Sequence, residues 1–152
     1  MASKQVWRRI LLVVAILAAI ALLYPAESTV CPAWRIQVVD GSGKPLKNAW
    51  VRQHWQDYSV ESNGHEEDSY TDVNGYISFP ERSIRASLLF RILGAILNTL
   101  SQGVHASYGA HAYIAAYGNI VDGKRLEGSV SYQEGESLPK QLVTYVNDLH
   151  LR

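Results

Sequence analysis

An uncharged apolar run from Ile10 to Leu23 constrains this chain more than any other feature, because such a run is costly to expose to water. Basic residues stand just before it, at Lys4, Arg8 and Arg9. A cationic region followed by an apolar one is the order found in secretory signal peptides and signal anchors. Residues 1–28 are therefore predicted to be a targeting segment, and residues 29–152 remain to build a folded domain.

The sequence leaves two fates open for this segment. Its apolar core at 10–23 suits a signal peptide and is shorter than the roughly 20 residues that cross a bilayer comfortably. The small residues Ala26 and Ser28 permit cleavage after Ser28, which would secrete the domain, whereas an uncleaved segment is a membrane anchor. In both cases the basic residues predict a cytoplasmic N-terminus. The domain is therefore expected on the periplasmic or extracellular side.

Composition excludes two classes of protein. The 14 Lys and Arg residues balance the 14 Asp and Glu residues, so no strong cationic surface predicts nucleic-acid binding. Cys31 is the single cysteine, so the chain has neither an internal disulfide nor a multi-cysteine zinc site. We expect no nucleic-acid partner and no cofactor.

Short alternating segments begin at Trp34. In "WRIQVVD", Trp34, Ile36 and Val38 fall on one side of a strand, because side chains alternate with a period of two. The stretch "GSGKP" turns the chain, and alternation returns at 50–57, where neither face is wholly apolar. The polar stretch "SNGHEEDS" at 62–69 is predicted to be a loop.

The segment "TDVNGYISFP" at 71–80 suits either a calcium loop or a tight turn. The spacing of its acidic residues lacks the third oxygen ligand and the later Glu of a helix-loop-helix calcium site. Asn74-Gly75 between two strand-like runs instead predicts a β-hairpin with a type I′ turn, in which Asp72 accepts hydrogen bonds from the turn backbone. The apolar face of this hairpin would contain Tyr70, Ile77 and Phe79.

The segments "IQVVDGSGKPLKNAWV" at 36–51 and "YTDVNGYISF" at 70–79 share a set of residues with a known module. Together they resemble the carboxypeptidase regulatory-like domain, a small β-sandwich related in shape to transthyretin and to the B-type repeats of collagen adhesins. The residues that carry the resemblance are Val39, Asp40, Gly43, Pro45, Leu46, Asn48, Ala49, Val51, Thr71, Asp72, Gly75 and Phe79. In that family these positions are structural, so the resemblance implies a fold and brings no active site to this chain.

A helix is predicted where the chain departs most from a plain sandwich. Ser83 or Ser87 suits the start of this helix and Gly103 its end, which places the helix at about 86–102. The apolar residues at helical spacing are Leu88, Leu89, Ile92, Leu93, Ile96, Leu97 and Leu100. We expect this face to pack in the core, and contact with a lipid surface is the alternative.

Strand-like segments follow the helix at 105–118 and 125–133, with a hairpin connection at 118–125, and 141–149 is predicted to be the last strand. The predicted fold is therefore mainly β. It is an Ig-like or transthyretin-like antiparallel β-sandwich with one inserted α-helix, preceded by an N-terminal membrane helix.

Candidate chemistry is sparse. His54, His105 and His111 are the candidate metal ligands, but no pair has the spacing of a preformed chelate on one helix or strand. No nucleophile-elbow motif occurs either. The sequence therefore favours a non-catalytic protein over an enzyme.

The function predicted from these features is that of a non-catalytic, extracytoplasmic, membrane-anchored β-sandwich module for binding or assembly. Its expected partners are the membrane, through the N-terminal segment, and another envelope protein. Two alternatives from other classes stay open. One is a metal-dependent enzyme on a transthyretin-like sandwich that uses the scattered histidines, and the other is a lipid-surface protein that uses the 86–102 helix.

Overall fold

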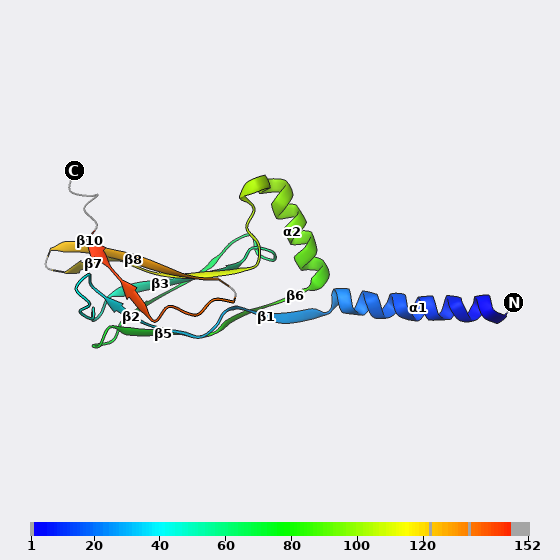
Figure 1. The fold of residues 1–152 in the computed structure, drawn as a ribbon, viewed down its shortest axis with the longest axis horizontal. Coiled ribbons are helices and arrows are strands. Elements are labelled where there is room, and N and C mark those ends of the chain that lie inside the picture. Colours follow the sequence, from blue (N-terminus) through cyan, green and yellow to red (C-terminus); the bar gives the residue numbers. More distant parts are fainter. Residues whose placement is uncertain (1, 122, 134, 147–152) are drawn as a thin grey trace.

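The computed structural model describes residues 2–121, 123–133 and 135–146. Figure 1 shows one helix, α1 (Ala2–Leu23), projecting from the end of an elongated β-rich body, and a second helix, α2 (Leu88–Gln102), at that same end. A short 3-10 helix, η1 (Gly103–His105), follows α2. The fold is mainly β with antiparallel sheets, as predicted.

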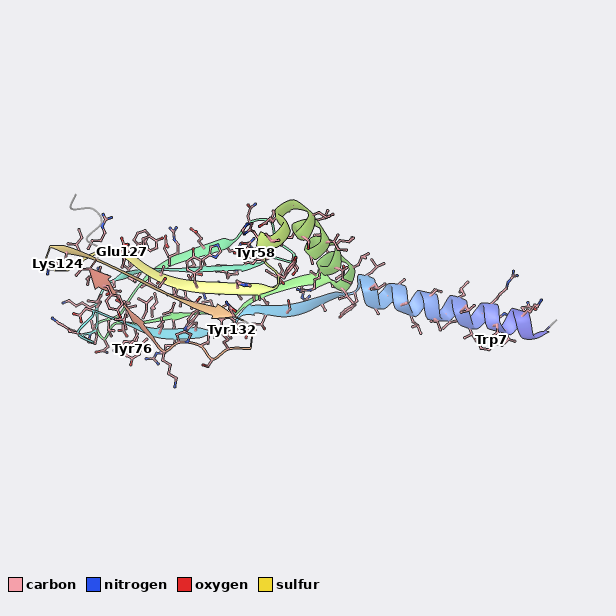
Figure 2. The ribbon with its side chains drawn as sticks, turned by 45° about the horizontal axis from the view of Figure 1, so that its top comes forward. Trp7, Tyr58, Tyr76, Lys124, Glu127 and Tyr132 are labelled. Carbon is pink, nitrogen blue, oxygen red and sulfur yellow. The ribbon has the colours of Figure 1, made fainter. Side chains whose placement is uncertain are left out.

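Helix α1 projects from the β-rich body and contacts the rest of the chain at α2. Residues 4–23 are exposed along their whole length, and Figure 2 shows the helix, with Trp7 labelled, projecting beyond the rest of the molecule. The segment Lys4–Leu23 is long and apolar enough to cross a membrane, a property that signal sequences share. The structure is thus compatible with both fates of this segment.

Ten strands follow in the described part of the chain. They are β1 (Pro25–Cys31), β2 (Trp34–Val39), β3 (Trp50–Asp57), β4 (His65–Tyr70), β5 (Tyr76–Phe79), β6 (Arg82–Ser87), β7 (Ala110–Val121), β8 (Lys124–Gln133), β9 (Gln141–Val143) and β10 (Tyr145–Val146). They form a five-stranded sheet in the order β10-β8-β7-β3-β4, a three-stranded sheet in the order β5-β2-β9, and a ribbon of β1 and β6. All pairs are antiparallel except β2 with β9.

The core lies between the five-stranded and three-stranded sheets. Trp34, Ile36 and Val38 of β2 are buried on one side of their strand, as predicted from their alternation. The opposite sheet contributes buried residues such as Val51 and Ile114. Two sheets that share one apolar interior make a β-sandwich, which confirms the predicted fold class.

The predicted turn at 72–76 is present, but the prediction that it joins two strands of one hairpin is wrong. Strand β4 belongs to the five-stranded sheet and β5 to the three-stranded sheet, so the turn carries the chain from one sheet to the other. Tyr70 is consequently 61% exposed, while Ile77 and Phe79 are buried. Gly75 has a φ of 75°, whereas Asn74 does not have a positive φ, which excludes a type I′ turn.

Asp72 has the turn role predicted for it. Its Oδ1 accepts hydrogen bonds from the backbone N–H groups of Asn74 and Tyr76, at 2.8 and 2.9 Å. The backbone N–H of Gly75 also donates to the Asp72 carbonyl, at 3.0 Å. The carboxylate is therefore a turn acceptor, as an Asx turn requires.

Two further strand predictions need correction. Residues 65–69 of the predicted loop belong to β4, an edge strand whose charged side chains stay in solvent, and such charges are common on sheet edges. The predicted last strand is divided at Thr144, whose N–H donates to the Val39 carbonyl at 2.8 Å, so β9 and β10 join different sheets. Residues 147–149 of that prediction lie outside the described residues. The β7–β8 hairpin is confirmed, but its bounds differ from the prediction: β7 begins at Ala110 rather than at 105, and residues 119–121 and 124–125 of the predicted connection belong to the two strands.

Helix α2 forms where predicted, but its packing differs from the prediction. The Ser87 hydroxyl accepts from the Phe90 N–H at 3.2 Å, and Gly103, with a φ of 57°, follows the last turn. No residue of α2 is buried. Leu93, expected in the core, is 47% exposed, because the helix contacts the sandwich with its polar side instead.

The β1–β6 ribbon connects α1 to the sandwich. Strand β1 begins two residues after α1, and Pro25 pairs with Ser87 at the other end of the register. Glu27 accepts from the Ser83 hydroxyl at 2.6 Å and from Arg85 at 3.0 Å, and these hydrogen bonds lower the pKa of its carboxyl. Residues 25–28, included in the predicted targeting segment, thus form part of a strand.

Candidate functional site

The outer face of the five-stranded sheet contains a group of aromatic and charged side chains that contact one another. Strand β3 pairs with β4 and β7, and its residues alternate, so Val51 and Gln53 turn inward while their neighbours turn outward. We call the outward group the aromatic face, and it consists of Trp50, Arg52, His54, Glu66, Asp68, Tyr113 and Tyr117. The register places these residues together from three strands.

Arg52 lies at the centre of the aromatic face. Its Nε and Nη2 donate to the two carboxylate oxygens of Asp68 at 2.7 and 2.8 Å, and its Nη1 lies 2.6 Å from Glu66 Oε2. The guanidinium carbon is 5.6 Å from the Trp50 ring centre and 5.7 Å from the Tyr117 ring centre. The hydrogen bonds from Arg52 lower the pKa of Asp68. The guanidinium is thus fixed in position beside two aromatic rings.

The aromatic rings of this face contact one another. The rings of Trp50 and Tyr117 meet edge to face with centres 4.5 Å apart. His54 stacks on Tyr113 with ring centres 4.8 Å apart, and its burial lowers the pKa of the imidazole. Tyr113 nevertheless keeps 39% of its surface exposed. The face is therefore ordered and still open to a partner.

The structure places two of the three candidate histidines on this side of the sheet. His54 is opposite Tyr113 and His111 is opposite Gln56, so the two histidines are diagonal neighbours on β3 and β7. His111 meets the Tyr58 ring edge, and its Nδ1 is buried without a hydrogen-bond partner. His105 lies in η1 after α2 and is exposed.

No metal centre follows from this placement. Within residues 2–121, 123–133 and 135–146, no three His, Cys, Asp or Glu side chains are arranged to hold a metal ion. The carboxylates next to His54 instead bond to Arg52. The structure therefore gives the metal-dependent alternative no support.

A pocket of about 380 Å³ lies between the ribbon and the edge of the five-stranded sheet. Its walls include Trp55, with Arg82 4.2 Å above the ring, and His65, stacked 5.5 Å from the same ring. Arg82 donates to Gln53 and Glu67, and His65 lies 2.6 Å from Glu61. These polar groups hydrogen-bond to one another. They therefore line the pocket with their hydrogen-bonding capacity already used within the protein.

Cys31 lies in the core. Its side chain is buried, and the Gln53 amide donates to its sulfur at 3.5 Å. Burial raises the pKa of the thiol to about 11, so the thiolate that reacts with oxidants and alkylating reagents is scarce at neutral pH. Cys31 is therefore a packing residue.

Sequence reasoning missed the aromatic face. The alternation of Trp50, Arg52 and His54 against Val51 and Gln53 was visible, but a sequence pattern does not give the partners of each side chain. Those partners come from the registers of β3 with β4 and with β7. The available signal in the sequence was that both faces of the 50–57 segment contain polar residues.

A family model described as a domain of unknown function (DUF6795) matches residues 36–135. The matched region runs from within β2 to just beyond β8, so it contains both α2 and the aromatic face. No curated protein and no solved structure matches the chain.

Proposed function

The chain belongs to the DUF6795 family, and we propose that its domain is a non-catalytic module, held outside the cytoplasm by α1, that binds another protein of the cell envelope. The observation that carries the binding role is the fixed Arg52 guanidinium beside the Trp50 and Tyr117 rings on an open sheet face. Trp, Tyr and Arg are the residue types most enriched among the energetic hot spots of protein interfaces.

Membrane anchoring is supported by the contacts that follow α1. Cleavage after Ser28 would divide β1, whose residues Pro25 to Ser28 pair with β6. The hydroxyl of Ser28 also accepts a hydrogen bond from Arg91 at 2.6 Å. Because these residues belong to the folded body, we propose that the segment is retained as an anchor. The basic residues before the apolar run favour a cytoplasmic N-terminus.

We also propose that the sandwich is of the carboxypeptidase regulatory-like type. The resemblance implies structural roles for the matching residues, and several of them stabilise turns. Asp40 Oδ1 accepts from the N–H groups of Ser42 and Lys44 at 2.9 and 3.0 Å. Thr71 Oγ1 accepts from the Ala49 N–H at 2.9 Å. These hydrogen bonds support the proposal, because residues that carry the resemblance have the structural roles that it implies.

The topology proposal predicts that a reporter fused after Arg152 is active only in its exported form. A reporter that requires disulfides and an oxidising compartment should be active there. A reporter that works only in the cytoplasm is the matched control and should be inactive. Activity of the cytoplasmic reporter at this position would contradict the proposed orientation.

The binding proposal predicts a specific crosslink from the aromatic face. A photo-crosslinking residue at Tyr113 in the full membrane-bound chain should give a discrete adduct with another protein. The same residue at the exposed Ser78, on β5 of the other sheet, is the control and should not give that adduct. Arg52→Ala should lower the Tyr113 adduct by roughly tenfold or more, as expected for loss of a hot spot.

Two results would contradict this binding site. The first is that the crosslinker gives the same adducts at position 113 as at position 78. The second is that Arg52→Ala leaves the adduct from position 113 unchanged. Thermal melting of Arg52→Ala should accompany the measurement, because a folded variant is needed to assign the loss to the interface.

A further inference from the structure

Helix α2 contacts the sandwich with its polar and small residues. Arg91 donates from Nη1 to Asp57 Oδ2 at 2.7 Å, and the Asp57 side chain is only 4% exposed. Asn98 donates to the Ser107 carbonyl at 2.5 Å. Gly94 lies so close that a Cβ there would be 2.1 Å from the Ser59 carbonyl oxygen. These positions recur three and four residues apart and therefore form one side of the helix.

The opposite side of α2 is apolar and uncovered. Its residues are Leu89, Ile92, Leu93, Ile96, Leu97 and Leu100, which are 37% to 78% exposed. Arg91 is the sole charged residue between Leu88 and Gln102, and it turns toward the sandwich. An exposed apolar patch of this kind marks a contact with a membrane or another molecule.

The position of α2 identifies which of these it meets. Ser87, just before α2, pairs with Pro25, just after α1, so the start of α2 lies beside the end of α1. The two helices are in contact, and Figure 1 shows α2 steeply inclined to α1 at the end of the body nearest to it. When α1 crosses a bilayer, α2 is therefore at the surface of that same bilayer. Figure 2 labels Tyr58 beside α2. Its backbone carbonyl accepts from the Asn98 amide, so Tyr58 lies against the side of α2 that faces the sandwich.

We propose that α2 is an in-plane membrane helix, with its apolar side inserted into the leaflet from which α1 emerges and its polar side fastened to the sandwich. The inserted side lacks the cationic residues with which many interfacial helices bind anionic lipids. Its attachment therefore depends on apolar burial and requires no anionic lipid. This role rests on the anchoring by α1 and is independent of the proposed binding role of the aromatic face.

Fluorescence quenching in vesicles tests the insertion directly. The full chain is reconstituted in phosphatidylcholine vesicles, isolated by flotation, and labelled with an environment-sensitive fluorophore at Leu97→Cys. The native Cys31 is buried and its raised thiol pKa protects it, so it can stay. Spin-labelled phosphatidylcholine should quench the label several-fold more strongly at position 97 than at Ser42→Cys, an exposed site in the β2–β3 turn. High salt and added anionic lipid should leave the quenching unchanged.

A label at Leu17→Cys in α1 gives the value for a site inside the bilayer. Quenching at 97 no stronger than at 42, in a chain quenched at 17, would overturn the proposal. A shifted emission at 97 that lipid spin labels do not quench would also overturn it, since a protein would then cover the helix. Leu93→Asp should reduce the quenching at 97 several-fold, whereas Leu93→Met, which stays apolar, should not. The measurement at 97 in the otherwise native chain stands even where Leu93→Asp fails to fold.

Discussion

Replacing Trp34 by alanine is expected to destabilise the sandwich more than any other single truncation in its core. Trp34 is 1% exposed, and its Nε1 donates to the Pro139 carbonyl at 2.8 Å. Truncating a buried Trp to Ala costs about 3 to 5 kcal/mol, against a total free energy of unfolding of about 5 to 15 kcal/mol. The melting temperature of the chain in detergent should therefore fall sharply, or the domain should not fold.

Trp34→Phe is the matched control, because it keeps an aromatic ring against Tyr132, whose ring centre is 6.4 Å away. It removes the hydrogen bond to Pro139, which is worth about 1 kcal/mol, and some volume. Its loss of stability should lie well below that of Trp34→Ala. An alanine variant that melts at the wild-type temperature would contradict the burial of Trp34 between the two sheets.

The sequence predicted those features that depend on local pattern. Alternation identified Trp34, Ile36 and Val38 as core residues, and the capping residues Ser87 and Gly103 placed the limits of α2 to within two residues. These predictions succeed because the periodicity of strands and the ends of helices are set by neighbouring residues.

The sequence did not predict which sheet each strand joins. Asp72 and Gly75 make the same tight turn whether the chain returns along one sheet or crosses to another, so their residue types do not separate the two cases. The difference lies in distant contacts. Strand β5 pairs with β2 and β4 pairs with β3, each through main-chain hydrogen bonds. A local turn signal carries no information about those partners.

The orientation of α2 shows the same limit in another form. An apolar stripe on a helix predicts an apolar partner for that side, and the usual partner is the protein core. Here Arg91 hydrogen-bonds to Asp57, and Asn98 hydrogen-bonds to the Ser107 carbonyl. The polar side of α2 is therefore the side that contacts the sandwich. The candidate site was missed for the same reason, since Asp68 and Tyr117, which contact Arg52, lie on other strands.

The second large effect is expected from Gly75→Val. Gly75 has a φ of 75°, and a Cβ at this position would be 2.7 Å from the Val38 carbonyl oxygen and 3.0 Å from Pro45 Cβ. Backbone strain and overpacking together should lower the free energy of unfolding by about 2 to 6 kcal/mol. Chemical denaturation of the full chain in detergent measures this loss.

Gly43→Val separates the two causes, because Gly43 has a φ of 86° with nothing within 4 Å of a Cβ. It should show the backbone strain alone, so its loss of stability should be smaller than that of Gly75→Val. Calcium should change neither stability, since the Asp72 Oδ1 that could bind it already accepts two backbone N–H groups. Equal losses in the two variants would show that the contacts with Val38 and Pro45 relax freely. A calcium-dependent rise in the melting temperature of the native chain would instead return the turn at 72–76 to the class of metal-binding loops, because the ion would have to displace those N–H groups.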